Sequence, residues 1–169
     1  TRSTFESVER ILNINNISIK NKSIAELGSG WAPIFPYQLI IDGKAKKVDT
    51  YDINEHYNEK EIQLLNKTYV NNKEVTFVKK GKYNLLKDVS YFPQTNICNG
   101  NMESIDLVLS RFVLEHISPV DIIDIHKFFY STLKSGSLVL HLISPSDHRA
   151  YSDASLSFQD FLKYSEEEW

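Results

Sequence analysis

The sequence predicts an α/β fold in which a mostly parallel sheet is covered by helices on both faces. Short apolar runs alternate along the chain with longer stretches of helical periodicity. Two of these runs, at 105–110 and 137–143, resemble strands buried on both faces, as the central strands of parallel sheets are. This alternation runs through the whole span and is typical of a three-layer α/β/α sandwich.

Five strands are expected in chain order, at 24–27, 47–52, 74–79, 105–110 and 137–143. The first run ends at Gly28 and the second ends in an acid, Asp52. The segment 80–102 mixes glycine, asparagine, lysine and aromatic residues without a clear period, and it is expected to be irregular.

Three helices are expected between these strands. The first begins near Pro33, where a missing N–H is tolerated, and ends before Gly43. The second begins at a capping box formed by Asn58 and Glu61. The third begins after Ser118 and extends towards residue 135. Ligands of such sheets bind beyond the carboxyl ends of the strands, so function is expected in the loops at that edge.

Length and composition limit the possible classes of protein. The 169 residues fit a single domain, 1–169, and 41% hydrophobic residues suffice for one core. The formal net charge of -3 argues against a broad phosphate-binding surface, so no nucleic-acid partner is expected.

Cysteine usage and hydropathy suggest a location. Cys98 is the single cysteine, so an internal disulfide and a Cys-x-x-Cys zinc site are both excluded, and a reducing cytoplasm is expected. No apolar run approaches the roughly 20 residues that cross a bilayer, so no membrane association is expected.

A glycine-rich turn follows the first predicted strand and precedes the first helix. Gly28 and Gly30 can adopt backbone angles closed to other residues and place no side chain between the main chain and a ligand. Asp52 follows about 20 residues later and can accept hydrogen bonds from both hydroxyls of a ribose. Two plainer interpretations stay open: the turn as a tight connection only, and Asp52 as an acid near a helix N-terminus.

These residues resemble the class I S-adenosylmethionine-dependent methyltransferases, whose first motif is an acid, a spacer and Gly-x-Gly-x-Gly. Glu26, Gly28 and Gly30 match this motif, and Ala32 replaces the third glycine. The segment 105–117, with its string Val-Leu-Glu-His, resembles the fourth strand of the family and the helix that follows. The segment 133–137 resembles the Leu-Lys-Pro-Gly-Gly turn of the family, so that the matches cover about 23–143.

The resemblance implies a Rossmann-like fold, S-adenosylmethionine as cofactor and a set of contacts to it. Glu26 would lie near the methionine amino group, Asp52 would hold the ribose, and Ser110 and Arg111 would border the sulfonium. The implied cofactor-binding residues are Glu26, Gly28, Ser29, Gly30, Asp52, Ser110 and Arg111. Family members usually add two strands after the fifth, which are expected to be missing here.

Methyl transfer from a sulfonium needs alignment, and it needs a general base only where the acceptor keeps its proton until late. His148 and His116 are the candidate bases, because a neutral imidazole can accept a proton near pH 7. His141, inside the fifth strand, is expected to be structural. The expected acceptor is a small molecule or a sugar-type compound. No metal site is expected, because the five histidines lack the close spacing of ligand pairs.

Two alternatives are a non-catalytic cofactor-binding module of the same fold and an NAD-dependent dehydrogenase. Pro33 stands where the dinucleotide-binding motif has its third glycine, and this favours adenosylmethionine over NAD.

Overall fold

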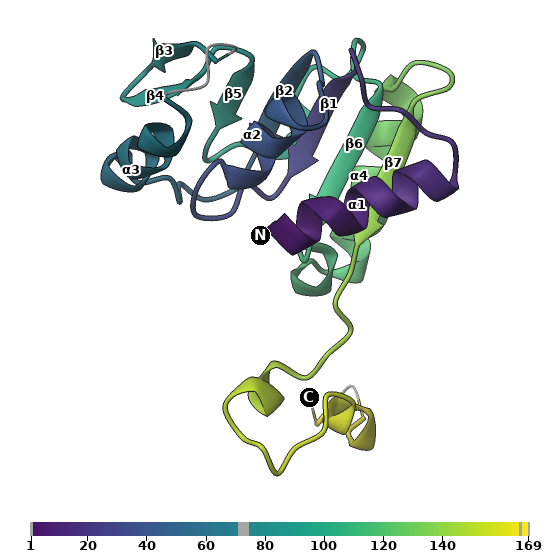
Figure 1. The fold of residues 1–169 in the computed structure, drawn as a ribbon. Helices are drawn as coiled ribbons and strands as arrows, with labels where there is room; N and C mark the ends of the chain where they lie inside the picture. Colours follow the sequence, from purple (N-terminus) through teal and green to yellow (C-terminus); the bar gives the residue numbers. More distant parts are fainter. Residues whose placement is uncertain (1, 71–74, 166, 169) are drawn as a thin grey trace.

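The computed structural model describes residues 2–70, 75–165, 167 and 168, and its centre is a sheet of five parallel strands (Figure 1). The strands are β1 Ser23–Leu27, β2 Lys47–Tyr51, β5 Val89–Phe92, β6 Leu107–Arg111 and β7 Leu138–Leu142. They lie in the order β5-β2-β1-β6-β7, and every pairing is parallel. The predicted α/β fold with a mostly parallel sheet is confirmed.

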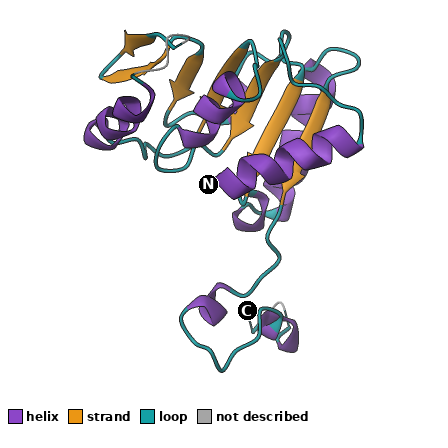
Figure 2. Ribbon diagram, viewed as in Figure 1, coloured by secondary structure: helices purple, strands orange, loops and turns teal. Residues whose placement is uncertain are grey.

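Helices cover both faces of this sheet (Figures 1 and 2). Helices α1 Arg2–Ile14 and α2 Ile34–Ile41 pack on one face, and α4 Pro119–Thr132 packs on the other. Helix α1 was not predicted. Its buried residues Phe5, Val8 and Leu12 follow helical spacing, so the sequence did contain the signal.

The third strand, predicted at 74–79, does not belong to the central sheet, so its predicted place is wrong. β3 Phe77–Lys80 pairs antiparallel with β4 Tyr83–Leu86 in a separate two-stranded sheet, against which α3 Glu59–Tyr69 packs. Glu74, where that prediction began, lies outside the described residues. The third strand of the central sheet is β5, inside the segment expected to be irregular. Only Val89 of its four residues is buried, so the strand has no apolar period to detect.

Two of the predicted helix starts are confirmed by side-chain caps. The Asn58 carboxamide accepts a hydrogen bond from the Lys60 amide, and the Ser118 hydroxyl accepts one from the Asp121 amide. Single-turn 3-10 helices lie at Ile97–Asn99 and Leu114–His116. Cys98, in the first of these, is partly buried, and this burial raises the pKa of its thiol.

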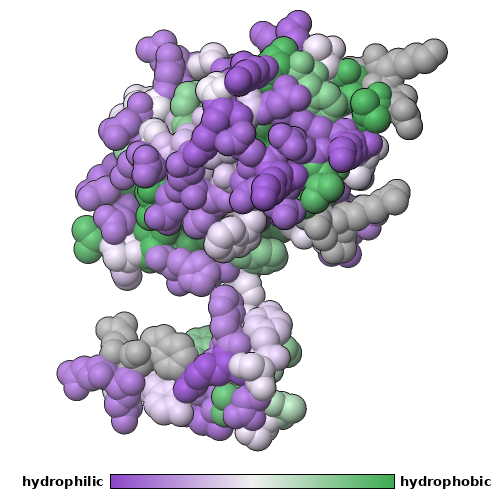
Figure 3. Space-filling model, turned by 90° about the vertical axis from the view of Figure 1, so that its left-hand side faces the viewer, coloured by the Kyte–Doolittle hydropathy of each residue, from purple (hydrophilic) through white to green (hydrophobic). Residues whose placement is uncertain are grey.

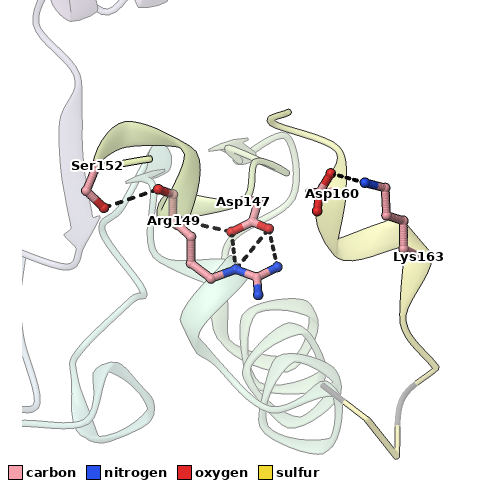
Figure 4. A network of polar contacts seen from close by, with 5 residues as sticks. All are labelled: Asp147, Arg149, Ser152, Asp160 and Lys163. Carbon is pink, nitrogen blue, oxygen red and sulfur yellow. Dashed lines mark hydrogen bonds and ion pairs between the residues drawn. The ribbon is translucent and has the colours of Figure 1, made fainter. Parts of the chain in front are cut away.

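The chain after β7 leads through an extended stretch to two further 3-10 turns, His148–Tyr151 and Asp160–Lys163 (Figure 1). The space-filling view shows this segment as a small lobe joined to the body by a narrow neck (Figure 3). Arg149 forks onto Asp147, with Nε 3.0 Å from Oδ1 and Nη2 2.6 Å from Oδ2, while Lys163 pairs with Asp160 (Figure 4). The Asp147 amide donates to the Phe158 carbonyl, and this hydrogen bond joins two parts of the segment.

Within the described residues, no helix is long and apolar enough to span a membrane.

Candidate functional site

The carboxyl ends of the parallel strands meet at one edge of the sheet, and the loops after β1 and β2 lie side by side there. The Gly28 amide donates to the Tyr51 carbonyl at 2.8 Å. Ser29 donates to Asp52 Oδ2 twice, from its amide at 3.0 Å and from its hydroxyl at 3.1 Å. Asp52 Oδ1 accepts from the Asn54 amide at 2.9 Å. The Asp52 carboxylate therefore fixes the glycine turn against the second strand.

The two glycines of the turn serve different purposes. Both have positive φ, +83° at Gly28 and +62° at Gly30. A Cβ atom on Gly28 would lie 2.3 Å from Val113 Cγ2, so packing against the segment after β6 requires glycine there. A Cβ atom on Gly30 would meet nothing within 4 Å. Gly30 thus leaves free space at the edge where a ligand is expected.

Glu26, the motif acid, is enclosed beneath this turn. Its side chain is fully buried; Oε2 accepts from the Thr50 hydroxyl at 2.7 Å, and Oε1 lies 3.4 Å from Arg111 Nη2. The Arg111 guanidinium also lies over the Phe35 ring, 4.0 Å from its centroid. Burial raises the pKa of Glu26, while the Arg111 charge opposes this shift. Glu26 and Arg111 lie close together, as expected for residues of one site. They contact each other on the α2 side of the sheet, whereas the resemblance implies that each contacts the cofactor.

Ser110 faces the opposite layer. It is fully buried, and its hydroxyl lies 2.6 Å from His141 Nδ1, between β6 and β7. This contact agrees with the structural role expected for His141. In the described conformation Ser110 does not reach the surface at the carboxyl edge, so its predicted contact with the sulfonium stays a prediction.

His56 and Trp31 belong to this edge and were missed by sequence reasoning. His56 Nε2 lies 3.6 Å from Asp52 Oδ1, and the Trp31 ring lies against the His56 ring with centroids 4.7 Å apart. Trp31 remains 76% exposed although it belongs to the glycine turn. The spacing of four residues between Asp52 and His56 was the available signal. Other large exposed apolar side chains follow the strands at this edge: Ile53, Phe112 and Ile143.

The two candidate bases lie next to each other in the segments that follow β6 and β7. The His116 and His148 rings have centroids 5.6 Å apart, and both residues are exposed. The neighbouring Glu115 accepts from the Ser144 amide at 3.2 Å. Its other oxygen, Oε2, is buried without a hydrogen-bond partner among the described residues.

Solved structures share this architecture at low sequence identity. An RNA methyltransferase from Salinibacter ruber in complex with S-adenosyl-L-homocysteine matches with a TM-score of 0.54 and 12% identity, over 80% of this chain and 73% of that one. A protein from Galdieria sulphuraria, provisionally assigned as a sarcosine dimethylglycine methyltransferase, matches with a TM-score of 0.56 and 14% identity, over 82% and 44%.

The chain shares its fold with these two methyltransferases. The methyltransferase fold is shared with a protein from Streptococcus thermophilus provisionally assigned as a hemolysin (TM-score 0.53, 15% identity, 82% of this chain and 42% of that one). The chain thus spans less than half the length of two of these three neighbours. No protein-family model matches the sequence, and the search of curated proteins gives no match.

Proposed function

We propose that this chain binds S-adenosylmethionine at the carboxyl ends of β1 and β2 and transfers its methyl group to an acceptor. The observation that carries the proposal is the free space at Gly30, on a turn held in place by Asp52. Several neighbours with the same fold are methyltransferases by name, and one of them holds S-adenosyl-L-homocysteine. The bound cofactor would supply an activated methyl group on sulfur, and the chain's own residues would bind and align.

Asp52 is the proposed ribose contact, although its carboxylate already accepts several hydrogen bonds within the chain. Oδ2 accepts from both Ser29 donors, while Oδ1 accepts from Asn54 and faces His56. A carboxylate has about four acceptor directions, so a ribose hydroxyl can use the direction towards His56 or replace the Ser29 hydroxyl. Glu26 would support the turn from below, since a direct contact with a ligand would require Arg111 to move.

The Gly30→Val variant tests the cofactor site, and Gly81→Val provides a matched control. Both glycines have nearly the same φ, +62° and +61°, and a Cβ atom meets open space at each. Only Gly30 lies at the carboxyl edge. We expect Gly30→Val to abolish binding of S-adenosyl-L-homocysteine in calorimetry and Gly81→Val to preserve it. Equal affinity in the two variants, or wild-type protection by NAD instead, would contradict the proposed site.

A small molecule or a sugar-type compound is the proposed acceptor. Arg111, at the end of β6, is paired with Glu26, and Arg149, in the segment after β7, is paired with Asp147. A polyanion such as RNA requires exposed cations, and its binding weakens steeply with salt. We expect turnover to depend weakly on salt between 50 and 200 mM, roughly within a factor of two. A fall of a thousandfold would assign a nucleic-acid acceptor instead.

His148 and His116 are the proposed acceptor-side residues. Both are exposed, and they lie in the segments that follow β6 and β7, within the 3-10 turns Leu114–His116 and His148–Tyr151. If either serves as general base, His148→Gln or His116→Gln lowers kcat by about a hundredfold and leaves cofactor affinity unchanged. An unchanged kcat in both variants would restrict these histidines to a structural role.

A non-catalytic cofactor-binding module is the second candidate function. The enclosed Glu26 favours it, because the motif acid is committed to Thr50 and Arg111. Cofactor binding without methyl transfer to any of a panel of hydroxyl, amine and carboxylate acceptors would support this candidate. The single cysteine fits a reducing compartment for either function, which makes the cytoplasm our proposed location.

A further inference from the structure

A chain of polar contacts crosses from Ser110 on the central sheet to helix α4, on the opposite face of the sheet from Glu26 and Arg111. Ser110 Oγ lies 2.6 Å from His141 Nδ1, and His141 Nε2 lies 3.2 Å from His126 Nε2. His126 Nδ1 lies 2.7 Å from the Ile122 carbonyl oxygen one turn earlier in α4. Two imidazole rings from different elements therefore point their Nε2 atoms at each other.

The protonation of these rings follows from their partners. A carbonyl oxygen only accepts, so His126 Nδ1 carries a proton and donates it to Ile122. In the neutral ring this leaves a lone pair on His126 Nε2, directed at His141. The Ser110 hydroxyl can donate to His141 Nδ1, and the contact between the two Nε2 atoms then places the His141 proton on Nε2. A single proton, carried by His141 Nε2, then lies between His141 Nε2 and His126 Nε2.

The same geometry suits a divalent metal ion in place of that proton. Zinc binds histidine nitrogen at 2.0–2.1 Å, so two nitrogens at tetrahedral positions lie about 3.3–3.4 Å apart. The observed separation of 3.2 Å is close to this value. Histidine ligands of metals usually donate their other ring N–H to a carbonyl or another acceptor. Ile122 provides that acceptor for His126, and the Ser110 hydroxyl can provide it for His141.

We propose that His126 and His141 form a two-histidine site for a divalent transition metal ion such as Zn²⁺, with water completing the coordination. The two rings are the proposed protein ligands, because no group of three or more histidine, cysteine, aspartate or glutamate side chains among the described residues is placed to hold a metal ion together. Imidazole ligands favour Zn²⁺, Ni²⁺ and Cu²⁺ over Mg²⁺ and Ca²⁺. The spacing of 15 residues between the two histidines hides the pair from a search for close motifs.

Solvent can reach the proposed site from the surface of α4. His126 lines an open hollow there together with Ile122, Ile123, Lys127 and Tyr130. Lys127 is the cation nearest in sequence, and its ammonium pairs with Asp124 at 3.1 Å, which offsets its charge. Metal binding moves the His141 proton from Nε2 to Nδ1, where it is donated to Ser110 Oγ. No proton is released in total, and Ser110 changes from donor to acceptor.

Calorimetric titration with Zn²⁺ tests the proposal, with Mg²⁺ as the control ion. We expect one saturable Zn²⁺ site per chain and no binding of Mg²⁺. His126→Gln and His141→Gln should each weaken Zn²⁺ binding by at least about tenfold, and Ser110→Ala by about tenfold. The double variant His116→Gln/His148→Gln removes the other pair of neighbouring histidines and should bind Zn²⁺ as the wild type does.

A second measurement needs no substitution and so does not depend on a variant folding. Long-range ¹H–¹⁵N spectra of the wild-type histidine rings should show His141 protonated at Nε2 without zinc and at Nδ1 with it. Absence of saturable binding, Zn²⁺ affinity unchanged in His126→Gln, loss of binding in the His116/His148 double variant, or an unchanged His141 tautomer would each overturn the proposal. The site does not depend on the proposed methyltransferase function, which is tested separately by S-adenosyl-L-homocysteine binding.

Discussion

The last two residues of β6 are neighbours in sequence but belong to differently built layers. Arg111 faces α2 and meets the buried carboxyl of Glu26, with its guanidinium over the Phe35 ring. Ser110 faces α4 and meets His141, which continues to His126 at an open surface hollow. The α2 face of the sheet thus encloses the Glu26–Arg111 pair. The α4 face carries a hydrogen-bonded chain of uncharged side chains that ends at His126, beside the surface hollow.

This difference teaches how one strand can support two separate sites. A buried charge is costly unless its partner is in place, so the Glu26–Arg111 pair makes the α2 layer rigid and intolerant of change. Neutral hydrogen bonds cost less to lose, and a ring at the surface can exchange protons or bind an ion. We therefore expect substitutions on the α2 side to act mainly on the free energy of unfolding. Substitutions on the α4 side should act mainly on the proposed binding of Zn²⁺.

The largest expected effect comes from Glu26→Ala. It leaves the Arg111 guanidinium and the Thr50 hydroxyl without their buried partner, and we expect a loss of about 3–5 kcal/mol in the free energy of unfolding. Urea denaturation monitored by circular dichroism measures it. Glu26→Gln keeps an acceptor for Thr50 and should lose less. A loss below about 1 kcal/mol in Glu26→Ala would show that the pair is dispensable.

The pH dependence of the same pair gives a second prediction. Burial raises the pKa of Glu26 above its usual 4.5, so between these two pKa values the folded state binds the proton more tightly than the unfolded state. The contribution of Glu26 to stability is therefore present at low pH and falls as the pH rises through that window. The free energy of unfolding of the wild type minus that of Glu26→Gln should fall above about pH 4.5. A difference that rises would contradict the assigned direction.

Gly28→Ala tests the junction between the glycine turn and the segment after β6. Its Cβ atom would overlap Val113, and its φ of +83° strains any L-residue, so we expect a loss of about 2–4 kcal/mol. Adding Val113→Ala should relieve the overlap and leave the backbone strain. A double-mutant cycle should therefore give a favourable coupling of about 1–3 kcal/mol, whereas additive effects would place the cost elsewhere.

Ser110→Ala addresses the neutral face of β6. It removes the hydroxyl from His141 Nδ1, and we expect a loss of about 1–2 kcal/mol in the free energy of unfolding, well below that of Glu26→Ala. The two variants measured under the same conditions test the comparison between the layers directly. Equal losses would mean that Ser110 supports the sheet as strongly as the charged pair does.

The smallest expected effect is that of Ser29→Ala. One of its two hydrogen bonds to Asp52 is lost and the amide bond stays, so about 0.5–1.5 kcal/mol of stability is at stake. The variant frees an acceptor direction on Asp52, and we expect no loss of S-adenosyl-L-homocysteine affinity. A tenfold loss in calorimetry would assign Ser29 a direct role in cofactor binding.

Sequence patterns captured the three inner strands, β1, β2 and β6, whose residues are almost all buried. They also captured β7, but the expectation that 137–143 is buried on both faces is wrong, because β7 is an edge strand and none of its residues is fully buried. The first, second, fourth and fifth predicted strands became β1, β2, β6 and β7, and the turn from Gly28 to Gly30 lies beside Asp52 because their parallel strands are adjacent. The strand β5, at the other edge of the sheet, escaped detection because only Val89 of its four residues is buried.

Side-chain contacts between elements far apart in the chain could not be predicted from the sequence. Glu26 and Arg111 are 85 residues apart, and His126 and His141 meet only because α4 packs on β7. The sequence indicated that Glu26 and Arg111 belong to one site but not that they would neutralise each other. Those contacts depend on which layer each side chain enters, and strand register decides that.

Cys98 has a practical consequence for spectroscopy. As the single cysteine, with a thiol pKa raised by burial, it carries little thiolate at neutral pH. A new thiol at Lys79→Cys, on the exposed side of the two-stranded sheet, would therefore react with a maleimide dye well before the native one. The chain accordingly offers a site for selective fluorescent labelling without removal of its own cysteine.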